Sequence, residues 1–208
     1  DLAVNAAILS AFKTSGQRCV SAGRILVAES RVDAFVLRLV ATVKRLRIGD
    51  PLDPNTFMGP VINDLAVEKV LSYNMLARQE QAEVLLDGGR LFDDAHKNGA
   101  FLAPFVYLLE HGPDVRCLRE EVFGPHLAVI PFRTNEEAVR IYNDTDFGLS
   151  MAVITENYRT MRLFREECEF GMGYVNLPCI GAEVHLPFGG VKKSGNGHPS
   201  AAGLVEAV

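Results

Sequence analysis

The sequence predicts an α/β fold in which helices flank a parallel or mixed sheet. Strand-like and helix-like segments alternate along the chain, which is the pattern of sheets covered by helices. The strand-like runs are short and rich in β-branched residues, whereas the helical segments carry apolar residues at spacings of three and four. The composition agrees, because 48% of the 208 residues are hydrophobic and 23% are charged, which suffices for one sizeable core.

The first half of the chain supplies three predicted helices and two predicted strands. Residues 1–14 are rich in alanine and leucine and predict a helix that stops near Ser15-Gly16, and residues 24–28 (RILVA) predict a buried strand. A third helix is expected from residues 63–64 through Leu76, and residues 83–86 predict a strand. The second helix is predicted between the strand at 24–28 and the third helix, and it ends at Gly49 and Pro51. Its apolar stripe consists of Val32, Phe35, Val36, Leu39, Val40, Val43 and Leu46.

The second half continues the alternation and then changes character. Strand-like runs occur at 101–109, 127–132 and 151–155. Helices are predicted over 135–143, capped by Asn135, and over 157–167. Residues 176–203 are rich in glycine and are expected to form loops. Because loops on a rigid scaffold often carry functional residues, this tail is a candidate site region.

The composition argues against several functional classes. The formal charge is −5, so the chain lacks the basic balance with which proteins meet nucleic acids or anionic membranes. No apolar run reaches the roughly 20 residues of a membrane-spanning helix, and no signal-peptide pattern opens the chain. We therefore expect no nucleic-acid partner and no membrane partner.

The cysteines predict neither a disulfide scaffold nor a metal site. There are four, at positions 19, 117, 168 and 179, without a Cys-x-x-Cys pair or a histidine at ligand spacing. Free thiols favour a reducing compartment, so a cytoplasmic protein is expected.

Cys19 lies in the first segment that could carry chemistry, GQRCVSAGR at residues 16–24. A turn glycine and an arginine precede this cysteine, and nearby positive charge and backbone N–H groups favour a thiolate. A lone cysteine is, however, commonly a small buried core residue. Spacing alone leaves both interpretations open.

Two further segments attract attention. Residues 119–125 (REEVFGP) combine two carboxylates with an aromatic side chain and a turn, which suits binding of hydroxyl groups but also describes a solvated acidic turn. Residues 186–195 (LPFGGVKKSG) contain glycines and lysines but lack the spacing of a phosphate-binding Walker loop. A tight surface turn is the plain alternative for this segment.

Taken together and in this order, these segments resemble the aldehyde dehydrogenase superfamily. The resemblance extends from residue 1 to about residue 203. The matching segments are GQRC at 16–19, MGPVI at 58–62, EEVFGP at 120–125, NDTDFGLSMAV at 143–153, GYVN at 173–176 and LPFGGVKKSG at 186–195.

The resemblance implies an aldehyde dehydrogenase catalytic-domain fold, with residues 1–208 as one catalytic domain. It implies that an aldehyde is oxidised to a carboxylic acid with hydride transfer to NAD or NADP, through a hemithioacetal and a thioester on Cys19. The backbone N–H of Cys19 would stabilise the oxyanion. Glu121 would hold the nicotinamide ribose hydroxyls, and Phe123 would pack beside the nicotinamide end of the cofactor.

The substrate pocket and the remaining machinery follow from the same resemblance. Phe188 would line the aldehyde pocket, and Arg18 and Val20 would shape it beside the nucleophile. The general base, a second oxyanion donor, the dinucleotide-binding domain and a C-terminal oligomerisation strand are expected outside this chain. We therefore expect a homo-oligomer, dimer or tetramer, for the intact protein and no useful activity for the chain alone. Relatives usually have Arg-Glu where this chain has His198-Pro199.

Other interpretations stay open. A cysteine hydrolase or acyltransferase would pair Cys19 with one of the five histidines, with Gln17 as an oxyanion donor. Alternatively, the chain is a non-catalytic dimerisation scaffold. A Gly-Ala-Glu stretch at 181–183 resembles family members that act on amino-acid-derived semialdehydes. Cys117 and Cys179 are interpreted as bystanders, and His111, His126 and His185 as residues of turns and loops.

Overall fold

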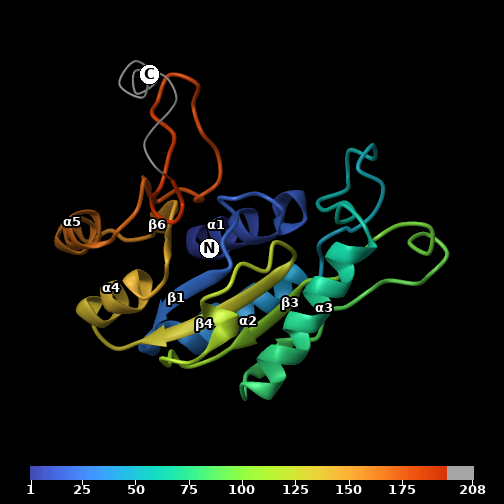
Figure 1. The fold of residues 1–208 in the computed structure, drawn as a ribbon, viewed down its shortest axis with the longest axis horizontal. Coiled ribbons are helices and arrows are strands. Elements are labelled where there is room, and N and C mark those ends of the chain that lie inside the picture. Colours follow the sequence, from blue (N-terminus) through green and yellow to red (C-terminus); the bar gives the residue numbers. More distant parts are fainter. Residues whose placement is uncertain (196–208) are drawn as a thin grey trace.

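The computed structural model describes residues 1–195, and its centre is a four-stranded sheet with the order β1-β4-β3-β2 (Figure 1). β1 (Arg24–Ala28), β4 (His126–Phe132) and β3 (Phe105–Leu108) run parallel. β2 (Glu83–Leu86) pairs antiparallel with β3 at the edge. The predicted α/β fold with a mixed sheet is therefore confirmed.

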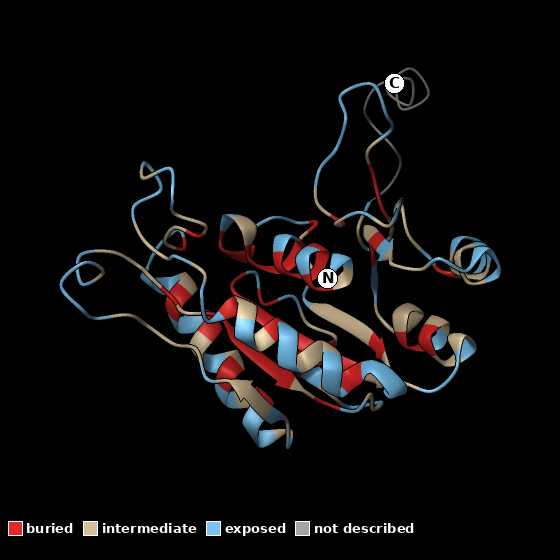
Figure 2. Ribbon diagram, turned by 180° about the vertical axis from the view of Figure 1, so that it is seen from behind, coloured by how far each residue is buried: buried red, intermediate tan, exposed pale blue. Residues whose placement is uncertain are grey.

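Helices cover both faces of this sheet. α1 and α2 share a hydrophobic cluster with one face, and α3 and α4 share another with the opposite face. Figure 2 shows α2 lying in front of the sheet when the molecule is seen from behind. The bounds are Leu2–Phe12 for α1, Val32–Val43 for α2, Asp64–Gln79 for α3 and Asn135–Asn143 for α4.

The central strands divide their side chains between these two clusters. Alternate residues of a strand point to opposite faces, so a strand between two helical layers is apolar throughout. The cluster beneath α1 and α2 receives Val106, Leu127 and Val129. The cluster beneath α3 and α4 receives Phe105, Tyr107, Ala128 and Ile130. All seven side chains are fully buried, which makes β3 and β4 the rigid base of the molecule.

Side-chain caps fix where three helices begin. Asn63 accepts a hydrogen bond from the backbone N–H of Ala66 at 2.9 Å and starts α3. Asn157 accepts from two backbone N–H groups and starts α5 (Tyr158–Glu167). The prediction that Asn135 caps α4 was wrong by one residue, because Thr134 accepts the bond from Glu137. Its position just outside the first turn suits the β-region backbone that a cap requires.

Two predicted elements are shorter in the structure. α2 ends at Val43, and the chain then turns, although Leu46 still packs on the same cluster as the stripe. The strand expected over 101–109 is only β3, because Pro104 has no N–H to donate to a ladder. A short 3-10 turn, η2 (Glu29–Arg31), joins β1 to α2. Within residues 1–195, no helix has the length and apolar character needed to cross a membrane.

The C-terminal part forms two small sheets beside the main one. β6 (Ser150–Val153) pairs parallel with β7 (Met172–Val175), and β5 (Phe147–Gly148) pairs antiparallel with β8 (Val191–Lys192). β6 falls on the run predicted at 151–155, whereas β5, β7 and β8 were not predicted as strands. The loop between β7 and β8 rises away from the body (Figure 1). The difference at His198-Pro199, and the tail beyond residue 195, lie outside the described residues.

Candidate active site

The loop that carries Cys19 begins with an unusual backbone turn. In η1 (Lys13–Gly16), Thr14, Ser15 and Gly16 have φ values of 57°, 58° and 66°. Such left-handed conformations are costly for residues with a Cβ and natural for glycine. A Cβ on Gly16 would also overlap the carbonyl group of Gly124. The backbone of the GQRC segment therefore packs directly against the turn of the EEVFGP segment.

The MGPVI segment is the support of this loop. The Ser15 hydroxyl donates to the Gly59 carbonyl at 2.8 Å, and the Gln17 side-chain oxygen accepts from the backbone N–H of Ile62 at 2.9 Å. The Gln17 side chain is thus tied to the MGPVI segment through its amide oxygen. Three motifs far apart in sequence are joined at one place.

Cys19 itself lies at the corner of a closed turn. The carbonyl of Arg18 accepts from the backbone N–H of Ser21 at 2.9 Å, and the Ser21 hydroxyl oxygen accepts from the Arg18 N–H at 3.1 Å. The Cys19 side chain is exposed. Within residues 1–195, the backbone N–H groups of Cys19 and Val20 bond to no other protein group. The turn therefore presents a sulfur together with two available N–H donors.

The other cysteines are buried and are held as neutral thiols. Burial raises the pKa of Cys117 to about 12 and that of Cys168 to about 12, and it also raises the pKa of Cys179. Since the thiolate is the nucleophilic form of cysteine, these three are poor nucleophiles. Cys19 is the single exposed cysteine of the chain, and all four lie within the described residues.

Residues of helix α3 and its C-terminal end hydrogen-bond to the EEVFGP segment and to the turn before it. Glu80, at the end of α3, accepts from the backbone N–H groups of Arg116 and Cys117 and so holds η3 (Arg116–Leu118). The Tyr73 hydroxyl donates to Glu120 at 2.5 Å, and Arg116 contacts the same carboxylate at 2.7 Å. These bonds lower the pKa of Glu120, chiefly through Arg116. Both carboxylate oxygens of Glu120 therefore have hydrogen-bond partners within the protein.

Glu121 and Phe123 are arranged differently from Glu120. Glu121 is exposed, and Phe123 is 38% exposed with a left-handed φ of 62°. Between them, Val122 is 8% exposed and packs into a small cluster with α3. The buried valine anchors the segment while its two neighbours face outward. A left-handed aromatic residue is uncommon, and such strain gathers at functional sites.

The C-terminal end of α4 is a hub that binds the remaining motifs. Asp144 forms ion pairs with Arg119 and with His111, and the charge and hydrogen bonds of Arg119 are the main reason that the pKa of Asp144 is lowered despite partial burial. Lys192 donates to the carbonyls of Asn143 and Thr145. Cationic side chains complement the negative end of a helix. The hub therefore ties the EEVFGP and PFGGVKKSG segments to one helix end.

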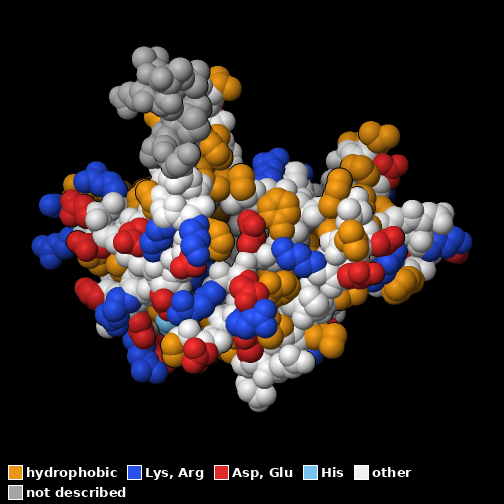
Figure 3. Space-filling model, in the orientation of Figure 1, with side chains coloured by type: hydrophobic (Ala, Val, Ile, Leu, Met, Phe, Trp, Pro, Cys, Tyr) orange, Lys and Arg blue, Asp and Glu red, His pale blue; other side chains and the backbone are white. Residues whose placement is uncertain are grey.

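A cleft of about 840 Å³ connects these elements. Arg18, Cys19, Glu121 and Phe123 all line it. Val20 is buried at 7% exposure and Phe188 is half-buried in the loop before β8, and neither lines the cleft. On the face of the molecule drawn in Figure 3, acidic and basic side chains are interspersed. The structure thus brings four of the six predicted site residues to one cavity.

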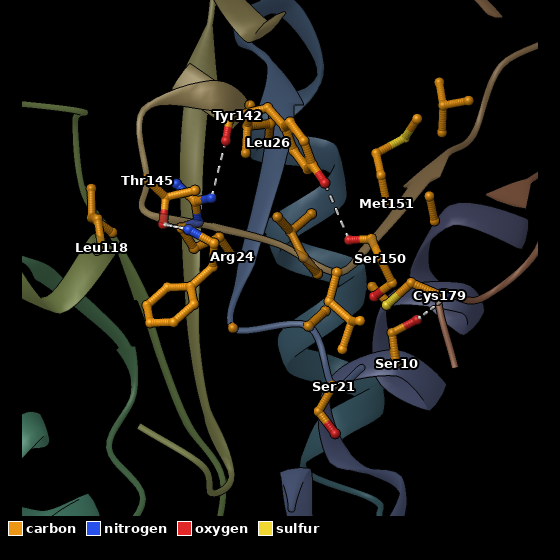
Figure 4. A pocket seen from close by; sticks show the side chains of 18 of the residues that line it. Ser10, Ser21, Arg24, Leu26, Leu118, Tyr142, Thr145, Ser150, Met151 and Cys179 are labelled. Carbon is orange, nitrogen blue, oxygen red and sulfur yellow. Dashed lines mark hydrogen bonds between the residues drawn. The ribbon is translucent and has the colours of Figure 1, made fainter. Parts of the chain in front are cut away.

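The lining of the cleft also contains polar residues that the sequence did not reveal. Figure 4 shows Ser10 of α1 beside Cys179, and Tyr142 reaching Ser150. Arg24 donates to the carbonyl of Tyr142 at 3.3 Å, and burial lowers the pKa of Arg24. These residues come from α1, β1, α4, β6 and the loop after β7, and no local sequence pattern marks them. The interpretation of Cys179 as a bystander was incomplete, because its thiol donates to the carbonyl of Val20 at 3.1 Å.

The histidines do not form a catalytic pair with Cys19. His126 was expected in a turn but lies buried on β4, with its ring between Asn74 and the hydroxyl of Tyr107. His111 binds Asp144, and His96 binds Asp93. None of the histidines within residues 1–195 hydrogen-bonds to Cys19. No group of three metal-ligating side chains exists in that part of the chain.

Comparison with known proteins identifies the relatives of this architecture. The sequence profile described as "Aldehyde dehydrogenase family" matches residues 1–208. The chain belongs to the aldehyde dehydrogenase family. Among curated aldehyde dehydrogenases, the 4-trimethylaminobutyraldehyde dehydrogenase of Rattus norvegicus is 36% identical over 207 residues, covering 98% of this chain and 41% of the relative. The corresponding enzyme of Sus scrofa matches over the same shares, also at 36% identity.

Solved aldehyde dehydrogenase structures share the fold. The betaine aldehyde dehydrogenase of Staphylococcus aureus, solved in complex with NAD+, superposes with a TM-score of 0.93 at 33% identity, covering 99% of this chain and 41% of that chain. A putative aldehyde dehydrogenase from Burkholderia cenocepacia gives a TM-score of 0.89 at 36% identity, covering 98% and 41%. The chain thus spans about two fifths of the length of the relatives that it matches.

Proposed function

We propose that this chain is the catalytic domain of an NAD(P)-dependent aldehyde dehydrogenase in which Cys19 is the nucleophile. One observation carries the proposal: the single exposed cysteine lies on a turn with two available backbone N–H groups and shares a cleft with Glu121 and Phe123. A thiolate needs access to its substrate, and a developing oxyanion needs donors aimed at it. The exposed Cys19 side chain and the two backbone N–H groups without a partner in residues 1–195 support these two roles.

The chemistry assigned to the chain's own residues is as follows. The Cys19 thiolate attacks the aldehyde carbon, a C–S bond forms, and the oxygen becomes an oxyanion beside the backbone N–H of Cys19. Loss of a hydride from that carbon leaves a thioester. Water then attacks the thioester, the C–S bond breaks, and a carboxylic acid leaves while the thiol is regenerated.

The cleft suits the nicotinamide end of a dinucleotide. The cofactor, when bound, accepts the hydride. Glu121 is exposed and lines the cleft, so its carboxylate can accept hydrogen bonds from ribose hydroxyls, and the half-exposed ring of Phe123 offers an apolar face beside it. A relative solved in complex with NAD+ supports the use of a nicotinamide cofactor. The residues that select NAD or NADP, and the general base, would come from the part of the protein beyond these residues.

Arg18 bears on which aldehydes are accepted. It is exposed, lines the cleft next to Cys19, and forms no ion pair with a carboxylate within residues 1–195. A free guanidinium attracts an anionic substrate group and repels a cationic one. We therefore assign an aldehyde with a carboxylate tail in preference to a trimethylammonium aldehyde of the kind named for the rat relative. R18Q should raise KM for the carboxylated aldehyde and leave KM for an uncharged aldehyde nearly unchanged.

The alternatives have less support. A cysteine hydrolase needs a histidine partner, and no such bond exists in the described part of the chain. A Cys–His ion pair would keep the Cys19 thiolate reactive well below pH 6. A labelling rate that is already lost when the pH is lowered to 6 would therefore contradict a hydrolase. A non-catalytic scaffold would not need an exposed cysteine in the cleft.

The decisive experiment mixes this chain with a separately expressed cofactor-binding half and follows NADH absorbance with a panel of aldehydes. We expect aldehyde-dependent reduction in the mixture and none with the chain alone. C19S should abolish the reduction, and C168S is the matched control because Cys168 is buried away from the cleft lining. Reduction that persists with C19S would refute the assigned nucleophile, and light scattering on the mixture would report the expected homo-oligomer.

A further inference from the structure

We infer that Cys179 is a positioning residue which, together with Ser10, holds the backbone of the Cys19 turn in its reactive geometry. The inference rests on the proposed role of Cys19. It concerns two buried side chains, 4% exposed in Ser10 and 6% exposed in Cys179, that do not touch the substrate chemistry themselves. They come from α1 and from the loop after β7, which are 169 residues apart in the chain.

Three hydrogen bonds make up this arrangement, which we term the Ser10–Cys179 clamp. The Cys179 thiol donates to the carbonyl of Val20 at 3.1 Å. The Cys179 backbone N–H donates to the Ser10 hydroxyl oxygen at 3.0 Å (Figure 4). The carbonyl of Ser10 accepts from the backbone N–H of Ala22 at 3.0 Å. The clamp therefore grips the chain on the C-terminal side of Cys19, one and three residues beyond it.

The clamp completes the restraint of the turn. On its N-terminal side, Gly16 packs against Gly124 and Gln17 binds Ile62. On the other side, within residues 1–195, the hydrogen bonds of the clamp and of the Arg18–Ser21 turn fix the peptide groups that follow the nucleophile. Since a peptide unit is planar, fixing the carbonyl of Val20 fixes the plane of the following peptide bond and limits rotation at Val20.

The chemistry of the thiol suits this role. Burial raises the pKa of Cys179, so the group remains an S–H donor at neutral pH and does not compete with Cys19 as a thiolate. Its donation leaves no buried carbonyl unpaired at Val20, a residue that is itself 7% exposed. Loss of the donor would free the Val20 carbonyl to turn and would disorder the N–H groups beside the nucleophile.

The test compares C179A and C179S with C168A. C179S keeps a donor of similar size, whereas C168A removes another buried thiol that forms no hydrogen bond to the turn within residues 1–195. We expect C179A to lower kcat of the reconstituted mixture, and the rate of haloacetamide labelling of Cys19 in the chain alone, by roughly three- to tenfold, the worth of one hydrogen bond. C179S should recover most of both rates, and KM for the cofactor should stay unchanged.

Every outcome bears on the inference. Rates for C179A equal to wild type, rates for C179S as low as for C179A, or an equal loss in C168A would each overturn it. Should C179A fail to fold, S10A removes the hydroxyl at the other end of the clamp and should produce the same loss with the Cys179 thiol intact. Labelling needs no cofactor, so a mixture without activity would count against the proposed function while the labelling rates still decide the clamp.

Discussion

Acidification should destabilise the fold through one buried histidine, His126. Its side chain is 4% exposed and lies on β4 between Asn74 and Tyr107. The Asn74 amide nitrogen donates to the Gly88 carbonyl, so the amide oxygen faces the ring and accepts from Nδ1–H. Nε2 then faces the Tyr107 hydroxyl at 3.1 Å. The Tyr107 hydroxyl also donates to the Cys117 carbonyl, so the neutral state of the ring rests on its burial: desolvation lowers the pKa of His126 to about 4.

The magnitude follows from the linkage between protonation and folding. The ordinary pKa is 6.5, so the folded protein resists protonation down to about 4. Above pH 6.5 both states are neutral and the stability is fully present. As the pH falls, the unfolded chain takes up the proton first, and stability is lost at about 1.4 kcal/mol per pH unit until the folded state is also protonated. A difference of 2.5 in pKa therefore corresponds to a loss of about 3 kcal/mol.

Urea unfolding at several pH values between 4 and 8 measures this loss. Tyrosine fluorescence can serve as the probe, because the chain contains no tryptophan. H126Q should show a shallower decline below pH 6.5 than wild type. His96 has a raised pKa, owing to its bonds with the Ile48 carbonyl and Asp93, so its contribution is largest at low pH and lost as the pH rises. H96Q, the matched control, should therefore decline more steeply than wild type. Equal slopes for H126Q and wild type would refute the reasoning.

Three further perturbations test the scaffold of the site. G16A should lower the free energy of unfolding in urea by about 2 kcal/mol or more, because a left-handed φ of 66° and contact with the Gly124 carbonyl both disfavour a Cβ. An unchanged unfolding midpoint would contradict this geometry. I130A removes a fully buried side chain of β4 and should lower the free energy of unfolding by about 2–5 kcal/mol in the same assay. A loss below about 1 kcal/mol would argue against a rigid core. D144N breaks the ion pairs with Arg119 and His111. Because the Asp144 side chain is 38% exposed, we expect a loss in stability below about 1 kcal/mol. We also expect weaker NAD+ binding to the reconstituted mixture by calorimetry, and an unchanged NAD+ affinity would show that these ion pairs do not influence the cofactor segment.

The local signals in the sequence located most of the main elements. The β-branched run at 24–28 became β1 with the predicted bounds, and the apolar run at 127–132 became β4. A helical apolar pattern predicted a helix from residues 63–64 through Leu76, and α3 formed there with Asn63 as its cap. In each of these segments the local preference and the tertiary environment agree, because the apolar face that predicts the element is the face that the core buries.

Only part of the candidate site could be predicted from the sequence. Cys19, Glu121 and Phe123 were identified from motif resemblance, and the structure places them on one cleft. Ser10 and Cys179 could not have been selected, since they contact each other only when α1 meets the loop after β7. The same holds for the buried position of His126 and the left-handed backbone of Phe123, which depend on packing around them.

The amino-acid sequence by itself therefore determined the α/β class, the family resemblance and the identity of the nucleophile candidate, because periodicity and motif residues are properties of neighbouring positions. Tertiary structure alone decided that β5, β7 and β8 are strands, since segments of two to four residues become strands only beside a partner. It also decided which cysteine is exposed, which carboxylate of the 120–121 pair is free, and what holds the Cys19 turn. Burial and hydrogen bonding between distant residues arise only when the chain is folded, and these are the quantities that set chemical reactivity.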